Sequence, residues 1–173
     1  MSAELFAHHY VEIRRIAKSR LRHMGDLTLL ETTDLINEAY MKLNASEAGK
    51  FENREHFLAY ASTAMRSIVV DFARAKGAAQ RRGEGDDLTL CTLLGDRLAA
   101  PTLNSDSLLD IDDALNTLTA TEPRLVQVVE MRFFGGFTED EIATALNISL
   151  RTVKRDWEKA RMLLLALLDD DAA

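Results

Sequence analysis

The stretch from Thr138 to Arg161 most constrains the fold, because it contains two helix starts separated by a very short connection. Thr138 is followed three residues later by Glu141, which is a capping box in which each side chain accepts a hydrogen bond from the other residue's backbone N–H. Ser149 is a second N-cap, and Asn147 before it tolerates the left-handed conformation that ends a helix. The spacing therefore predicts a short helix, a tight turn and a second helix.

The second of these helices has a basic face. Its apolar residues Val153 and Trp157 face inward. The sequence also has a small residue, Ala143, where the two helices cross closely, and an apolar residue, Ile148, in the turn. Together these features form the pattern of a helix-turn-helix. Its basic residues recur at three- and four-residue spacing and project from the opposite side: Arg151, Lys154, Arg155 and Lys159. Any surface helix carries some Lys and Arg on its solvated side. The caps, the turn and the basic face together favour a helix that enters a DNA major groove over an ordinary solvated face.

Composition predicts an all-α protein. Only two prolines and eight glycines interrupt the 173 residues, and 47% of residues are hydrophobic. No apolar run approaches the roughly 20 residues that span a bilayer, and the first residues lack a basic then apolar leader, so we expect a cytoplasmic protein without membrane insertion. The single cysteine, Cys91, and the four histidines have no ligand spacing, and no nucleophile or phosphate-binding loop stands out. We therefore expect no metal, no cofactor and no catalytic residues.

Three helices are predicted in the first half of the chain. Apolar residues keep helical spacing from Ala3 to Met24, from Asp34 to Asn44 and from Asn53 to Lys76, where Gly77 is expected to stop the last helix. The buried side of the third helix comprises residues about one turn apart: Phe57, Ala61, Ala64, Ile68 and Phe72. These helices form a predicted N-terminal domain over residues 1–76.

The pattern then breaks between Gly77 and Ser107, where glycine, proline and asparagine interrupt every period. A segment of this length is unusual inside one compact domain, so we predict a flexible linker over residues 77–107. Asp106 or Ser107 caps the next helix, with Leu108, Ile111, Leu115 and Leu118 inward. Pro123 opens a further helix that ends at Gly135. The C-terminal domain, residues 108–173, is thus predicted to have four helices, the last two being the helix-turn-helix.

The charge distribution is unusual for a DNA-binding chain. The formal net charge is −7. Residues 108–173 carry 13 acidic and 7 basic side chains, yet residues 151–161 carry five basic and two acidic ones. Since the positive charge is local, the free protein should attract DNA only weakly, and another component should supply most of the affinity.

Four segments resemble one family, the extracytoplasmic-function (ECF) group of bacterial sigma factors. They are Asp34–Leu43, Phe57–Arg74 with its ending Asp71-Phe72-Ala73-Arg74, Val129–Thr138, and Ile142–Arg155. The resemblance covers both predicted domains in the right order, with a linker between them. A helix-turn-helix is shared with many regulators, so its combination with the Asp34–Leu43 block makes the match specific.

The resemblance implies a dissociable subunit of RNA polymerase that selects promoters. The residues implied in binding core RNA polymerase are Asp34, Asn37, Glu38 and Met41. Those implied at the −10 element of promoter DNA are Arg66, Asp71, Arg74 and Lys76. Those implied at the −35 element are Arg151, Thr152, Lys154, Arg155 and Lys159. The acidic balance then becomes understandable, because the polymerase complex and not the free subunit binds the promoter.

One departure concerns control. Many family members have a denser acidic run where this chain reads Glu31-Thr32-Thr33-Asp34. Phosphorylation of Thr32 or Thr33 would add charge at a helix start, where phosphate is electrostatically favoured, although both residues also fit ordinary caps, the better-supported reading. The residues leave open whether an anti-sigma factor or a regulatory kinase controls the protein. Two other functions also stay open: a stand-alone helix-turn-helix repressor, and a helical signalling adaptor.

Overall fold

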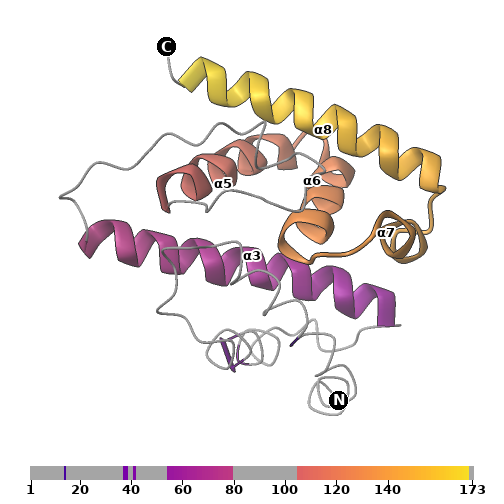
Figure 1. The fold of residues 1–173 in the computed structure, drawn as a ribbon, viewed down its shortest axis with the longest axis horizontal. Helices are drawn as coiled ribbons and strands as arrows, with labels where there is room; N and C mark the ends of the chain where they lie inside the picture. The colour runs from indigo at the N-terminus through magenta and orange to yellow at the C-terminus, as the bar shows by residue number, and fades with distance from the viewer. Residues whose placement is uncertain (1–13, 15–36, 39–40, 42–53, 80–104, 172–173) are drawn as a thin grey trace.

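The computed structural model describes residues 14, 37–38, 41, 54–79 and 105–171, and all structural statements below refer to these residues. Every regular element that they form is helical, which confirms the all-α prediction (Figure 1). In chain order the elements are α3 (Arg54–Ala79), α5 (Ser105–Thr119), α6 (Pro123–Val129), the π-helix η2 (Glu130–Phe134), α7 (Glu139–Ala145) and α8 (Leu150–Asp171).

Two predicted helix ends were wrong by a few residues. Gly77 does not stop α3, which continues to Ala79, because one glycine costs a helix only about 1 kcal/mol and alanines flank it on the C-terminal side. Helix α5 begins at Ser105, so Asp106 lies in its first turn, where a carboxylate is favoured by the helix dipole. The predicted helices before Asn53 lie almost wholly outside the described residues, as do residues 80–104. The division into two domains with a linker therefore stays a prediction.

The described helices share one hydrophobic core. Helices α5, α6 and α7 lie between α3 on one side and α8 on the other (Figure 1). The largest fully buried side chains come from α3, α5, α6 and η2: Phe57, Met65, Leu108, Ile111, Leu115, Leu125 and Phe134. The inward positions predicted for α5 are all buried, and those predicted for α3 are buried except for Phe72, which is half-buried. Helix α3 thus packs directly on the C-terminal helices.

The helix that opens at Pro123 changes its winding before it ends. After α6 it becomes the π-helix η2, in which the N–H of Gly135 donates to the carbonyl of Glu130 at 2.8 Å. Gly136 follows with a φ of 68°, a conformation that favours glycine. The predicted stop at Gly135 is confirmed, but the π turn was not predicted. This turn lies against α3, and its first residue, Glu130, is buried there.

Candidate nucleic-acid interface

The helix-turn-helix begins with the predicted capping box. The Oγ1 of Thr138 accepts a hydrogen bond from the backbone N–H of Glu141 at 3.3 Å, and the Oε2 of Glu141 accepts one from the N–H of Thr138 at 2.8 Å. Both side chains therefore satisfy donors that the first turn of α7 leaves without a helical partner. The start of α7 is defined by local chemistry alone.

The turn between α7 and α8 has the predicted left-handed residue. Asn147 has a φ of 52°, and its N–H donates to the carbonyl of Thr144 at 3.2 Å. The N–H of Ile148 donates to the carbonyl of Ala143 at 3.0 Å, which completes a Schellman motif. Ser149 then caps α8, since its Oγ accepts the N–H of Thr152 at 3.1 Å. The tight connection fixes the angle at which α8 leaves α7.

Helix α8 has one buried and one exposed side, as its sequence predicts. Val153, Trp157, Ala160 and Leu164 are buried in the shared core. The four basic side chains predicted to contact DNA are all exposed: Arg151, Lys154, Arg155 and Lys159. Thr152, predicted to contact DNA with them, is half-buried. The structure therefore brings these cations together on the outer side of the second helix of the motif, where a major groove would be met.

Most of these cations have an acidic neighbour. Lys154 Nζ lies 3.8 Å from Glu139 Oε2, and Lys159 is paired with Glu122. Arg151 makes no ion pair with any described residue. The pairs lower the positive potential of the exposed face, which agrees with the weak DNA attraction expected for the free chain. Arg151, in the first turn of α8, is the cation with the fewest internal contacts.

A buried carboxylate that the sequence reasoning missed supports this face. The side chain of Asp156 is 2% exposed and pairs with two arginines: Arg124 Nε at 2.6 Å and Arg155 Nη2 at 3.2 Å. The hydrogen bond to Asp156, and then its charge, raise the pKa of Arg124. In the sequence, Asp156 lies among the apolar positions of α8. An acidic residue on an apolar helix face needs a charged partner when it is buried, so this position could have indicated the ion pair. It links Arg124 of α6 to Arg155 on the exposed side of α8.

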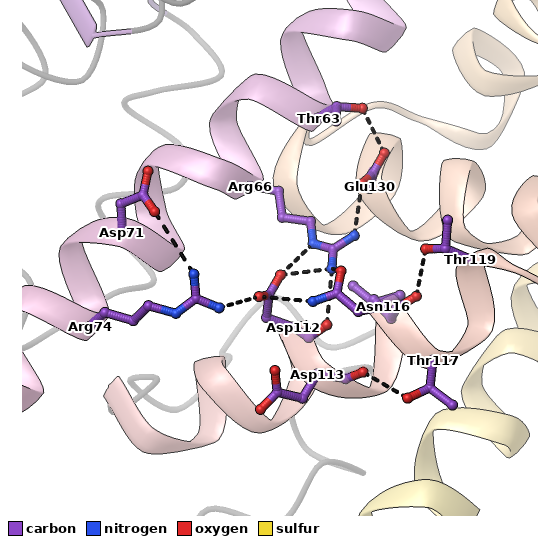
Figure 2. A network of polar contacts seen from close by, with 11 residues as sticks. Thr63, Arg66, Asp71, Arg74, Asp112, Asp113, Asn116, Thr117, Thr119 and Glu130 are labelled. Atoms are coloured by element: carbon purple, nitrogen blue, oxygen red, sulfur yellow. Dashed lines mark hydrogen bonds and ion pairs between the residues drawn. The ribbon is translucent and has the colours of Figure 1, made fainter.

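Only some of the residues implied at the −10 element are exposed. Asp71 and Arg74 are exposed on α3, whereas Arg66 is only 7% exposed. Lys76 lies in α3, but its side chain is outside the described part of the structure. Arg66 donates to Asp112, Glu130 and Asn116 of the C-terminal helices instead of facing solvent (Figure 2). The resemblance implies a contact between Arg66 and promoter DNA, whereas in this structure the side chain is buried against the C-terminal helices.

Three of the four residues implied in polymerase binding are described, and each is exposed: Asn37, Glu38 and Met41. Met41 has 64% of its surface exposed, which is high for a large apolar side chain. Asp34, like Thr32 and Thr33, lies outside the described residues. The exposure of this trio is consistent with a surface that binds a partner.

The described residues contain neither a cluster of metal ligands nor a membrane-spanning helix. No group of three or more His, Cys, Asp or Glu side chains there is arranged to hold a metal ion. Within the same residues, no helix is both long and apolar enough to span a bilayer.

The sequence matches the model of one known protein family. A family model described as ECF sigma factor matches residues 1–170. No curated protein and no solved structure matches the chain. The match covers the N-terminal half, the predicted linker and the helix-turn-helix, which is the extent of the resemblance seen in the sequence. The chain therefore belongs to the ECF sigma factor family, and its function is that of an RNA polymerase sigma factor, which binds core polymerase and promoter DNA in transcription initiation.

Proposed function

We propose that this sigma factor reads the −35 element with the exposed side of α8 and contacts the −10 element with the C-terminal half of α3. The observation that carries the first assignment is the common exposure of four cations on a helix whose opposite side is buried in the core. A helix held in this way presents its side chains to DNA at a fixed angle, which direct readout requires. Recognition, and not catalysis, is the mechanism.

The side chains on α8 divide into two chemical roles. Arg155 and Arg151 have guanidinium groups that can donate two parallel hydrogen bonds to a guanine edge. Lys154 and Lys159 act as point charges beside phosphates, and Thr152 is positioned through Ser149. Because Lys154 and Lys159 already have acidic neighbours, DNA must compete for them, and the net gain from each contact is small. Polymerase binding then supplies the remaining affinity.

The polymerase contact is proposed for the exposed face that contains Asn37, Glu38 and Met41, together with Asp34. Residues 37, 38 and 41 lie within about one helical turn, so they share a side of their helix. Two proposals concern the control of the protein. A regulatory kinase could phosphorylate Thr32 or Thr33, or an anti-sigma factor could capture the protein. We place the action of the protein in the cytoplasm, where core polymerase and DNA are both present.

The α8 assignment is tested with Arg151→Ala and Arg155→Ala. Each should weaken binding of the polymerase complex to a −35-containing promoter by about 1–3 kcal/mol, which is typical of a lost base contact. Affinity for core polymerase should stay unchanged, since α8 is not part of the proposed polymerase surface. Arg151 is the sharper probe because its removal breaks no ion pair with a described residue.

Arg161→Ala is the matched control. Arg161 lies on the same helix but outside the proposed contact, and it pairs with Glu158 at 3.3 Å. Its replacement should leave promoter binding unchanged. Equal losses of core binding and promoter binding in the Arg151 and Arg155 variants would argue against a DNA role for α8.

A further inference from the structure

The arginines of α3 are held by carboxylates of the C-terminal helices. We infer that Asp112 and Glu130 form an internal acidic surface that takes the place of promoter phosphates on α3, so that the free subunit is closed and α3 must leave α5 and η2 before it contacts DNA. The inference rests on the proposed role of α3 at the −10 element, and it adds the regulation of that site.

All three nitrogens of the Arg66 guanidinium donate to the C-terminal helices. Its Nε donates to Asp112 Oδ1 at 2.8 Å, its Nη1 to Glu130 Oε1 at 3.0 Å, and its Nη2 to Asn116 Oδ1 at 2.8 Å (Figure 2). The Nη2 also donates to the carbonyl of Asp112 at 3.0 Å. Since only 7% of Arg66 is exposed, a phosphate cannot reach it while these helices stay together.

The same carboxylate also holds the second arginine. Arg74 Nη2 lies 3.0 Å from Asp112 Oδ2, while the other end of that guanidinium is 3.9 Å from Asp71. Asp112 therefore bridges two side chains two helical turns apart on α3. Both belong to the set implied at the −10 element. One acid on α5 thus occupies two of the proposed DNA contacts.

The close packing around the cluster shows that the helices fit each other as a formed interface. Thr63 Oγ1 donates to Glu130 Oε2 at 2.7 Å, so both oxygens of this carboxylate are used by α3. Ser62 on α3 is fully buried and lies against Gly135, where an added Cβ would clash with the Ser62 Oγ. Val70 and Ala73, on the same side of α3, are also buried.

The chemistry of the cluster allows an exchange of partners. The two arginines face the two carboxylates of the C-terminal helices, and a buried ion pair contributes little net stability because desolvation offsets the attraction. Phosphate oxygens offer arginine the same charge-assisted, two-point geometry as a carboxylate. An opened α3 could therefore replace Asp112 and Glu130 with promoter phosphates as partners of its two arginines. Opening also exposes apolar side chains of α3 that share the core, such as Met65 and Ile68, and polymerase binding must supply that free energy.

The distance between α3 and α8 tests the inference directly. Spin labels are attached to the full chain at Ala75→Cys and Ala166→Cys, two exposed alanines, with the only native cysteine, Cys91, changed to Ser. The free subunit should give one short distance population, and addition of core polymerase should move it to a longer one. An unchanged distance in an assembled complex that transcribes normally would overturn the inference.

A matched pair of variants tests the role of the acids. Asp112→Asn combined with Glu130→Gln keeps the shapes and removes both charges, and it should produce the longer population in the free subunit. Asp113→Asn makes the same chemical change at the neighbouring exposed residue, whose carboxylate points away from Arg66, and should leave the distance unchanged (Figure 2). If the double variant stays closed, the acids are not what holds α3, and the inference fails.

Binding of a single-stranded −10 oligonucleotide to the free subunit separates this inference from the proposed function. The double variant should bind at least about tenfold more tightly than the unchanged chain, a difference of about 1.4 kcal/mol. Adding Arg66→Ala should remove that gain. If α3 opens but binding does not rise, the proposed −10 contact fails while the closed state stands. If binding rises without opening, the closed state fails.

Discussion

Gly135→Ala is expected to destabilise the protein through the contact between η2 and α3. The φ of Gly135 is −82° with a ψ of −25°, which alanine adopts easily, so the penalty comes from space alone. An added Cβ would lie 2.6 Å from the carbonyl oxygen of Met131 and from Cδ2 of Phe137, and closer still to Ser62 Oγ. These separations are far inside van der Waals contact, so neighbouring groups must move.

The size of the effect follows from what has to move. Met131 O is a backbone atom that accepts the N–H of Phe137 at 3.0 Å, and Ser62 Oγ donates to the carbonyl of Leu58 at 3.0 Å. Overpacking typically costs about 1–3 kcal/mol, and loss of the buried serine hydrogen bond costs about 1 kcal/mol. Replacing glycine restricts the unfolded chain and returns about 0.4–1 kcal/mol. The expected net loss of unfolding free energy is about 1–3.5 kcal/mol.

Urea unfolding followed by the fluorescence of Trp157 measures this loss, because it is the only tryptophan and is 4% exposed. Ser62→Ala is the partner variant, since it removes the nearest clashing atom. In a double-mutant cycle, Ser62→Ala should cost less in the Gly135→Ala protein than alone, by about 0.5–1 kcal/mol. Strict additivity, or a Gly135→Ala protein as stable as the unchanged chain, would refute the packing of α3 on η2.

Three further predictions concern separate parts of the structure. Asn147→Val should lower the free energy of unfolding by about 1–2 kcal/mol, because a β-branched residue disfavours the positive φ at this position. The control, Asn147→Gly, should not lower it. Urea unfolding of the two variants measures the difference. Trp157→Phe should lower it by about 1–3 kcal/mol, measured by circular dichroism, since it leaves a cavity beneath Arg132, whose Cζ lies 4.5 Å from the ring centre. Glu38→Lys should weaken binding to core polymerase in a pull-down without changing the circular dichroism spectrum; an unchanged affinity would move the interface elsewhere.

The helix-turn-helix could be predicted from sequence because its determinants are local. The Thr138 and Ser149 caps, and the Asn147 turn, each act within three residues of the backbone group they satisfy. The inward faces of α5 and α8 follow from helical spacing for the same reason. Sequence alone predicts a structural feature when the side chain and the backbone group that it satisfies lie within about one helical turn of each other.

The polar contacts between α3 and the C-terminal helices could not be predicted in this way. Arg66 reaches Asp112 and Glu130, which are 46 and 64 residues away in the chain. Periodicity shows that a helix has an apolar side, but it does not show which charged residues meet across two helices. A partial signal existed, because Asp112 lies among Leu108, Ile111 and Leu115 on the apolar face of α5, where an acid needs a buried partner.

The π turn at η2 has a consequence for the length of the chain. A π-helical turn holds one residue more than an α-helical turn, and each residue of an α-helix rotates the chain by about 100°. Deletion of one residue between Val129 and Gly135 would let this segment wind as ordinary α-helix, and the deletion would preserve its apolar composition. Phe133 and Phe134 would then point in new directions relative to Glu130, and Gly135 would no longer face Ser62. Sequences aligned to this chain with a single-residue gap here would therefore be expected to dock α3 differently, even if every other core residue were identical.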